Sequence, residues 1–209
     1  MGTYKRLEQL IEAFFLLARE VPQTRLIIAG SDHPMTPGYV ESMAQRFRGH
    51  NNIEFTGYVA EEKIPDLFST ATVLVMPYHS ATGASGVAHL ACQYGVPIIS
   101  SDIPDFRSMA EDENLAINFY EIGSAPSMAH EILRLLRDQK MQREMAEQNF
   151  SAALRMTMPQ IIRSYLRSFT LHQKAKAMQP ISRFRRIPAW IPSRSAIFRA
   201  AAPRWAPWI

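Results

Sequence analysis

The sequence predicts an α/β protein built around a doubly wound parallel sheet. Along most of its 209 residues, short apolar runs alternate with segments whose apolar residues recur at helical spacing. The runs have no polar face, which is typical of strands in a parallel sheet that helices cover on both sides. The chain is long enough for one domain of ordinary size and an appendage.

The alternation opens with an amphipathic helix over residues 5–20, whose apolar stripe consists of Leu7, Leu10, Ile11, Phe14, Leu17 and Ala18. Five apolar runs predict strands, at 25–30, 52–57, 72–77, 96–100 and 114–119. Among them we expect helices from about residue 38, at 60–71, at 86–94 and at 105–111. Three further helices are expected at about 125–138, 140–155 and 158–175.

Individual residues support several of these boundaries. Gly30 and Gly57 end the first two strands. The helix at 60–71 opens with acidic residues, which suit a helix N-terminus. Either Asp102 or Asp105 is expected to cap the helix at 105.

One strand is missing from the expected pattern, because the alternation begins with a helix. In the 3-2-1-4-5-6 strand order of a Rossmann-like sheet, strand 1 is central. If the chain has this fold, the sequence lacks the middle strand of its own sheet.

Ser80–Gly86 stand out, because none of these seven residues is larger than threonine. They lie between a predicted strand and a predicted helix. Small residues let another molecule approach the backbone, and a helix N-terminus attracts anions. The segment is therefore either a phosphate-binding loop or an ordinary strand-to-helix turn, and a lone loop of this kind is a weak motif.

Composition and motifs exclude several classes of protein. No apolar stretch approaches a membrane span, and the N-terminus does not have the pattern of a signal peptide. Cys92 is the only cysteine, so no intrachain disulfide can form, and its apolar neighbours indicate a core residue. The six histidines are scattered without metal-ligand spacing. We therefore expect a cytoplasmic protein without a metal site; no cofactor is expected either.

Residues 179–209 form a basic tail with six arginines, five prolines and no acidic residue, whereas residues 1–178 hold 17 Lys and Arg against 19 Asp and Glu. The prolines argue against one continuous helix. The tail is either a disordered extension or an interfacial anchor, with arginines on anionic lipid headgroups and Trp190, Trp205 and Trp208 at the acyl boundary. Nothing in the body of the chain supports nucleic-acid binding.

Four segments together resemble the carboxyl-terminal half of GT-B glycosyltransferases of the retaining family 4: GTYKRLEQLIEAF, LIIAGSD, IEFTGYVAEEKIPDLFSTATVLVMPY and HLACQYGVPIISSDIPDFRSM. The resemblance covers about residues 2–172 with the spacing kept throughout. It implies a Rossmann-like domain that binds a nucleotide-sugar donor across a cleft from an acceptor-binding domain. It also implies transfer of the sugar to a glycan or lipid-linked acceptor, with retention at the anomeric carbon and without a protein-bound metal.

The resemblance implies donor contacts for specific residues. Lys5 matches a lysine that neutralises the donor diphosphate, although the arginine that precedes it in the family is absent. The other expected donor-binding residues follow predicted strands, at Gly30, Gly57, Val59, Thr82, Gly83, Ser85, Gly86 and Val87. Backbone N–H groups of Ser85, Gly86 and Val87 would stabilise charge on the leaving diphosphate. No residue is assigned as catalytic.

The chain also departs from the family pattern. Many members have two glutamates, eight residues apart, at positions that correspond here to Thr82 and Leu90. Thr82 is still expected to reach the donor sugar, and His89 is a candidate donor contact or, alternatively, a core residue. Asp32 and His33 suggest an acid–base pair but are more typical of a turn before Pro34.

These observations predict a donor-binding domain with carboxyl-terminal helices over 1–175 and the appendage over 176–209. The chain alone is not expected to transfer sugar. Two alternatives remain: a non-catalytic nucleotide-sugar-binding subunit that needs a partner acceptor domain, and a truncated inactive product.

Overall fold

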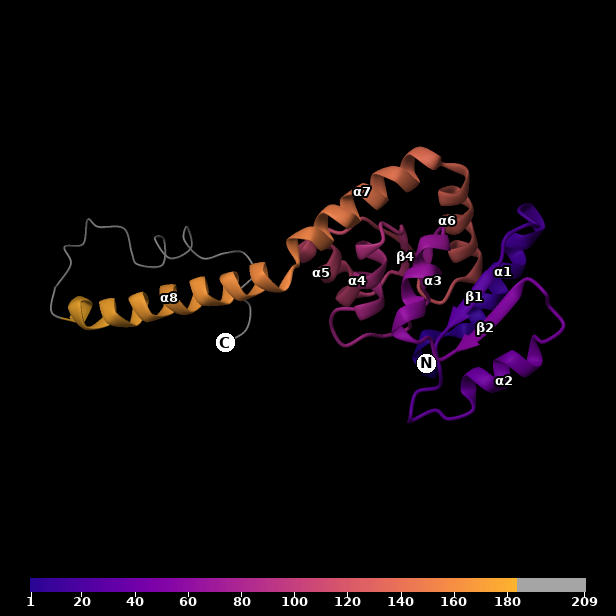
Figure 1. Cartoon of the computed structure of the whole chain (residues 1–209), viewed down its shortest axis with the longest axis horizontal. Helices are drawn as coiled ribbons and strands as arrows, with labels where there is room; N and C mark the ends of the chain where they lie inside the picture. The colour runs from indigo at the N-terminus through magenta and orange to yellow at the C-terminus, as the bar shows by residue number, and fades with distance from the viewer. Residues whose placement is uncertain (184–209) are drawn as a thin grey trace. The chain divides into compact units, whose positions relative to one another are not determined.

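The computed structural model describes residues 1–183 and divides the chain into two compact units, Met1–Arg155 and Met156 onwards (Figure 1). The strands of the first unit are β1 (Leu26–Ala29), β2 (Ile53–Gly57), β3 (Leu74–Met76), β4 (Ile98–Ser101) and β5 (Ile117–Tyr120). Its helices are α1 (Leu7–Glu20), α2 (Tyr39–Arg46), α3 (Ile64–Thr70), α4 (Gly86–Gln93), α5 (Pro104–Glu113), α6 (Ala125–Arg137) and α7 (Gln139–Arg155). Two short 3₁₀ helices are η1 (Thr3–Lys5) and η2 (Glu61–Lys63).

All strands pair in parallel, as the sequence predicts, but in two separate sheets. The first sheet has the order β1-β2, with Leu26 opposite Ile53. The second has the order β3-β4-β5, with Leu74 opposite Ile98 and Ile98 opposite Ile117. In the doubly wound order, the position between β1 and β3 belongs to the first, central strand. Within residues 1–183 no strand occupies this position, in agreement with the pattern of the sequence.

The first residues of the chain lie at the carboxyl end of this gap. The amino group of Met1 donates a hydrogen bond to the Ser31 carbonyl, and the His33 N–H donates to the Met1 carbonyl at 3.0 Å. These two bonds have the pattern of a parallel bridge. On the other side, the His79 N–H donates to the Tyr4 carbonyl at 2.7 Å. The segment thus connects the chain beyond β1 with the chain beyond β3.

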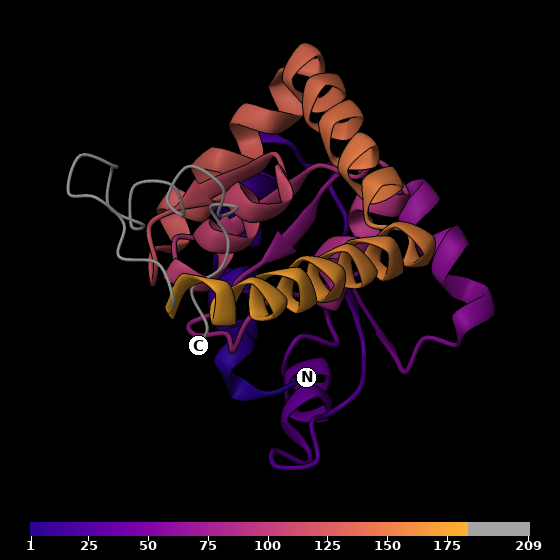
Figure 2. The ribbon, with the colours of Figure 1, turned by 90° about the vertical axis from the view of Figure 1, so that its left-hand side faces the viewer.

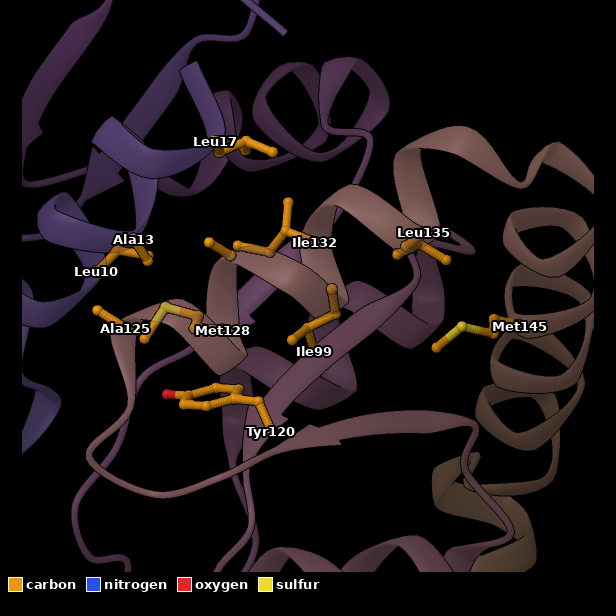
Figure 3. Packing of buried hydrophobic residues seen from close by; sticks show 11 residues of the cluster. Leu10, Ala13, Leu17, Ile99, Tyr120, Ala125, Met128, Ile132, Leu135 and Met145 are labelled. Carbon is orange, nitrogen blue, oxygen red and sulfur yellow. The ribbon is translucent and has the colours of Figure 1, made fainter. Parts of the chain in front are cut away.

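Helix α1 packs against both sheets of the first unit. Leu10, Ala13 and Leu17 belong to a buried cluster with β4, β5 and α6, which Figure 3 shows around Ile99 and Met128. The neighbouring stripe of α1 belongs to a second buried cluster with β1, β2 and α2, formed by Leu7, Ile11, Phe14, Ile28, Val40, Met43 and Ile53. One helix therefore supplies apolar contacts to both sheets.

Several predicted boundaries differ in the structure; for example, β5 begins at Ile117, three residues later than predicted, and β3 begins at Leu74, two residues later. The helix expected from residue 5 begins at Leu7, because Arg6 has a left-handed backbone (φ 45°) that separates η1 from α1. The cap predicted for α5 is wrong. Ile103 holds the N-cap position without a side-chain hydrogen bond, while Asp102 and Asp105 bind other groups. Strand β4 begins at Ile98, two residues later than predicted.

The helices at the end of the first unit follow the prediction closely. Figure 2 shows α6 and α7 as consecutive helices, joined by Asp138, whose carboxylate accepts the Met141 N–H at 2.9 Å. The N-cap of α6 is Ser124, whose hydroxyl oxygen accepts the Ser127 N–H at 3.2 Å.

The second unit consists of helix α8 (Met158–Arg183) as far as the structure describes it. The predicted domain boundary at 175 falls inside this helix. The predicted interfacial tail begins in the last turn of α8, and its greater part, 184–209, lies outside the described residues. None of the helices in residues 1–183 is both long and apolar enough to cross a membrane.

Because α1 packs on both sheets, truncation of either stripe should destabilise the whole first unit. We expect Ile11→Ala and Leu17→Ala each to lower the free energy of unfolding by about 2–5 kcal/mol, the range for large-to-small core changes. Both side chains are buried. Chemical denaturation followed by circular dichroism measures this effect. Glu12→Ala, at an exposed position of the same helix, should change stability by no more than about 0.5 kcal/mol. A core variant with the stability of the unchanged chain would contradict the joining role of α1.

Candidate functional site

The expected site residues lie at the carboxyl ends of the parallel strands, where ligands bind in open α/β sheets. Gly30 follows β1 and Gly57 ends β2, and the Gly30 N–H donates to the Gly57 carbonyl at 2.9 Å. Their φ angles are +130° and +66°, a region that favours glycine. A Cβ on Gly57 would meet nothing within 4 Å, so this end of β2 is open. Val59, two residues further on, is half-buried.

Lys5 lies near the carboxyl end of the other sheet. Its Nζ is 5.0 Å from the ring centroid of Tyr78, which follows β3, at cation–π distance. The Tyr4 ring packs edge-on against Tyr78, with centroids 5.8 Å apart, and against His33 at 6.4 Å. This aromatic group holds the Lys5 charge near the carboxyl end of β3 and connects it to the segment that follows Gly30.

The small-residue segment is tied to α5. The Gly83 N–H donates to the Asp105 carboxylate at 2.9 Å, and Gly83 has a φ of +95°. The Ser85 N–H points to the sulfur of Met109 at 3.5 Å, and Ser85 is buried. Thr82 is exposed, next to Gly83. Two backbone N–H groups of the segment therefore already have acceptors on α5.

Helix α4 begins at Gly86, directly after this segment. The first N–H groups of an α-helix have no acceptor within the helix, so Gly86 and Val87 direct donors out of its N-terminus. A Cβ on Gly86 would meet nothing within 4 Å, and its φ is outside the left-handed region. The fold itself therefore does not require glycine at this position.

His89 points toward α5. Its Nε2 is 2.7 Å from Oε2 of Glu113, and both side chains are partly buried. The hydrogen bond to Glu113 raises the pKa of His89, against the opposing effect of burial. The imidazole thus already has a polar partner, and its donor contact stays a prediction. Three residues further along α4, burial raises the pKa of the Cys92 thiol to about 11, as expected of a core cysteine.

Asp32 and His33 form a turn rather than an acid–base pair. The Asp32 carboxylate accepts the N–H groups of Gly38 and Val40, at 2.7 and 2.6 Å, and so satisfies the N-terminus of α2. Nδ1 of His33 accepts the Met35 N–H at 3.2 Å. The turn interpretation is confirmed. In the described part of the chain, no three His, Cys, Asp or Glu side chains are grouped so that they could hold a metal ion.

Two surface hollows occur in the part of the chain that the structure describes. One is lined by residues of the α6–α7 turn, including His130 and Arg134, and another by residues beside α5, including Asp102 and Arg107. Neither is lined by the expected donor-binding residues.

Sequence reasoning missed three residues that shape the site: Tyr4, Tyr78 and Asp105. Tyr4 precedes Lys5, and Tyr78 follows Pro77 at the end of a predicted strand. Their positions in the sequence therefore indicated that both side chains could lie at the strand ends. Asp105 gave a signal only as a possible helix cap. Its bond to Gly83 joins groups 22 residues apart, which local pattern does not specify.

Comparison with protein families matches residues 1–151 to the family described as Glycosyl transferases group 1. No match was found among curated proteins. Solved structures with a similar fold include HepE from Anabaena in complex with UDP, with a TM-score of 0.68 at 19% identity. Another is the C-terminal domain of the group 1 glycosyl transferase LpcC from Francisella tularensis, with a TM-score of 0.62 at 18% identity. A third is sucrose-phosphate synthase from Thermosynechococcus elongatus, with a TM-score of 0.59 at 21% identity.

The matched region covers a different fraction of each compared protein. The match covers 80% of this chain and 45% of HepE, and 80% of this chain and 42% of the sucrose-phosphate synthase. For LpcC it covers 75% of this chain and 83% of the C-terminal domain. The chain therefore spans less than half of the two longer proteins. At these identities the similarity shows the fold alone.

The ion pair between His89 and Glu113 predicts a pH dependence of stability. The pKa of His89 is raised in the folded state, so the pair stabilises the fold fully below the ordinary histidine value of 6.5. This contribution is lost as the pH rises through the raised pKa. Glu113→Gln should therefore cost more stability at pH 5.5 than at pH 8.5 (test values on either side of about 6.5). Denaturation at both pH values measures this difference. Glu111→Gln, at an exposed position of the same helix, should show no such difference. An equal cost of Glu113→Gln at both pH values would contradict the role of the pair.

Proposed function

Because the chain belongs to the glycosyl transferases group 1 family, we propose that it is the donor-binding half of a glycosyltransferase. In this proposal it binds a nucleotide-diphosphate sugar, and the sugar passes to a glycan or lipid-linked acceptor. The mixed α/β fold, which is that of GT-B carboxyl-terminal domains, supports a donor-binding role. The UDP in the HepE structure favours a nucleoside diphosphate as the ligand class.

The observation that carries the proposal is the group of features at the carboxyl ends of the strands. Lys5 brings a positive charge there through its contact with Tyr78. Gly57 leaves the end of β2 open, whereas a Cβ on Gly30 would meet the Met1 side chain at 3.4 Å. Helix α4 begins beside the small-residue segment with donors directed out of its N-terminus. A diphosphate requires cations and N–H donors, and its approach requires small residues.

The proposed chemistry uses these groups during bond cleavage. As the bond between sugar and diphosphate breaks, negative charge develops on the leaving nucleoside diphosphate. The Lys5 ammonium and the N–H groups of Gly86 and Val87 would stabilise this charge where it forms. The Ser85 N–H would take part only if it left the Met109 sulfur. Retention at the anomeric carbon, the family 4 assignment and a role in polysaccharide biosynthesis are parts of this proposal that rest on the sequence resemblance.

Asp105 sets a condition on donor binding. Its carboxylate accepts the hydrogen bond that the Gly83 N–H donates. Its negative charge therefore faces the segment that a diphosphate would approach. The Gly83 N–H can serve the donor only after it leaves Asp105. In the proposal, Gly86 and Val87 are therefore the main backbone donors to the diphosphate, while Thr82 and Val59 border the sugar and the base.

The proposal includes a second, acceptor-binding domain, because the chain spans 45% of HepE. It also places the chain in the cytoplasm, peripheral to the inner face of a membrane, where a lipid-linked acceptor would be within reach. Two other functions stay open from the sequence: a non-catalytic nucleotide-sugar-binding subunit, and a truncated inactive product. Binding of UDP by the chain would favour the glycosyltransferase half or the nucleotide-sugar-binding subunit over the truncated inactive product.

Gly86→Leu should abolish UDP binding without unfolding the chain. A Cβ at Gly86 meets nothing within 4 Å and its φ is ordinary, so the fold should accept leucine, whose side chain would cover the α4 N-terminus. Isothermal titration calorimetry with UDP measures the loss. Gly49→Leu is the matched control, because a Cβ there also meets nothing within 4 Å at an ordinary φ, between α2 and β2. Unchanged affinity in Gly86→Leu, or no UDP binding by the unchanged chain, would contradict the proposal.

Lys5→Ala should weaken UDP binding by about 1.5–3 kcal/mol, the range for hydrogen bonds to charged groups. The physical reason is the loss of the cation that the Tyr78 contact holds near the strand ends. The same calorimetric titration measures the effect, and added salt should reduce it. Lys140→Ala removes a charge from α7, where Lys140 is 3.7 Å from Glu144, and should leave UDP affinity unchanged. Equal affinities in the two variants would show that Lys5 is only a solvated lysine.

A further inference from the structure

Asp105 places a carboxylate beside the small-residue segment, where the ligand of the proposed function is itself an anion. The carboxylate accepts the Gly83 N–H at 2.9 Å, across 22 residues of sequence. The bond joins two elements, because Gly83 precedes α4 and Asp105 lies in the first turn of α5. A neutral hydroxyl or amide oxygen could accept the same N–H, so the hydrogen bond by itself does not require a charge. The charge therefore has a consequence of its own for the ligand.

The negative charge of Asp105 is not balanced by an ion pair within residues 1–183. The ion pairs that α5 makes there join Arg107 to Asp102 and Glu113 to His89. The first turn of a helix favours negative charge, because its N–H groups carry partial positive charge. A carboxylate is ionised at neutral pH. The small-residue segment therefore lies beside a full negative charge.

This charge lies at the sugar end of the proposed donor. In the proposed function the base borders Val59, the diphosphate meets the N-terminus of α4 at Gly86, and the sugar borders Thr82. Thr82 precedes Gly83, so a carboxylate bonded to Gly83 lies beside the sugar rather than the base. Three residues separate Gly83 from Gly86, a span of at most about 11 Å at about 3.8 Å per residue. The charge of Asp105 can therefore act on the phosphate that carries the sugar.

A nucleotide sugar and a free nucleoside diphosphate differ at this end of the ligand in two ways. The sugar has hydroxyl groups, which can donate hydrogen bonds to a carboxylate. When the bond between the sugar and the terminal phosphate oxygen breaks, the oxygen keeps the electron pair. The terminal phosphate of the product has a second ionisation at about pH 6, so at neutral pH the product has about one more negative charge. A carboxylate at this position therefore attracts one ligand and repels the other.

We propose that Asp105 is a specificity-determining residue that favours the nucleotide sugar over the free nucleoside diphosphate. Lys5 and the N–H groups of Gly86 and Val87 bind the phosphates of both ligands, whereas Asp105 repels the ligand with the additional charge. After sugar transfer, the same repulsion favours release of the nucleoside diphosphate. The inference rests on the proposed function, because it concerns the end of the ligand that bears the sugar.

The test measures the affinities of the full chain for UDP and for UDP-glucose by isothermal titration calorimetry at neutral pH. Asp105→Asn removes the charge but keeps a side-chain oxygen that can accept the Gly83 N–H. It should tighten UDP binding at least about threefold, because unit charges at this separation still interact at a protein surface. UDP-glucose should not bind more tightly, because the variant also offers its hydroxyl groups a weaker acceptor.

Two further variants separate the local charge from other effects. Asp112→Asn removes the same net charge at an exposed position of the same helix and should leave both affinities unchanged. Asp105→Ser also keeps an acceptor for the Gly83 N–H and should change the two affinities as Asp105→Asn does. Agreement between the Asn and Ser variants would show that the effect follows from the charge and not from one substitution's effect on the fold.

The outcomes that oppose the proposal are distinct from one another. Equal tightening of UDP and UDP-glucose in Asp105→Asn would overturn it, because the residue would then repel any diphosphate without discrimination. No change in either affinity would also overturn it and leave Asp105 with a hydrogen-bonding role alone. A chain that binds UDP but not UDP-glucose would overturn it as well. In these three cases the chain still binds a nucleotide, whereas binding of neither ligand by the unchanged chain would contradict the proposed function itself.

Discussion

Helix α1 places side chains in both buried clusters, and this packing is the constraint on which the candidate site depends. The β1-β2 and β3-β4-β5 sheets are not joined by strand pairing within the described residues. Apolar contacts from α1, together with the backbone bonds of Met1 and Tyr4, connect the two sheets. The strand ends that carry Gly30 and Gly57 and those that carry Tyr78 come from different sheets. One amphipathic helix that packs on both sheets therefore brings these strand ends into one unit.

Helix α5 has a comparable role on a smaller scale. Asp105 binds the Gly83 N–H, Met109 faces the Ser85 N–H, and Glu113 pairs with His89, so three residues of one helix fix the small-residue segment and the start of α4. The arrangement leaves the donors of Gly86 and Val87 at the helix N-terminus. It also places a carboxylate beside a surface proposed to bind an anion, which limits how much of the segment the ligand can use.

Charge is divided unevenly along the chain. The first unit is acidic, and its positive site charge comes from Lys5, which the aromatic contact with Tyr78 positions. All charged residues from Met156 to Ile209 are basic. The proposed donor binding therefore depends on short-range geometry at the strand ends rather than on the net charge of the chain.

The sequence by itself determined the order and type of nearly every element of the first unit, because apolar periodicity and strand-ending glycines such as Gly57 are local signals. It also predicted a gap in the sheet, and within residues 1–183 no strand lies between β1 and β3. Only the tertiary structure decided that Asp105 binds Gly83 instead of capping α5, and that His89 pairs with Glu113. Those contacts join residues more than 20 positions apart. They depend on how α4 and α5 pack beside one another, which no pattern within either helix specifies.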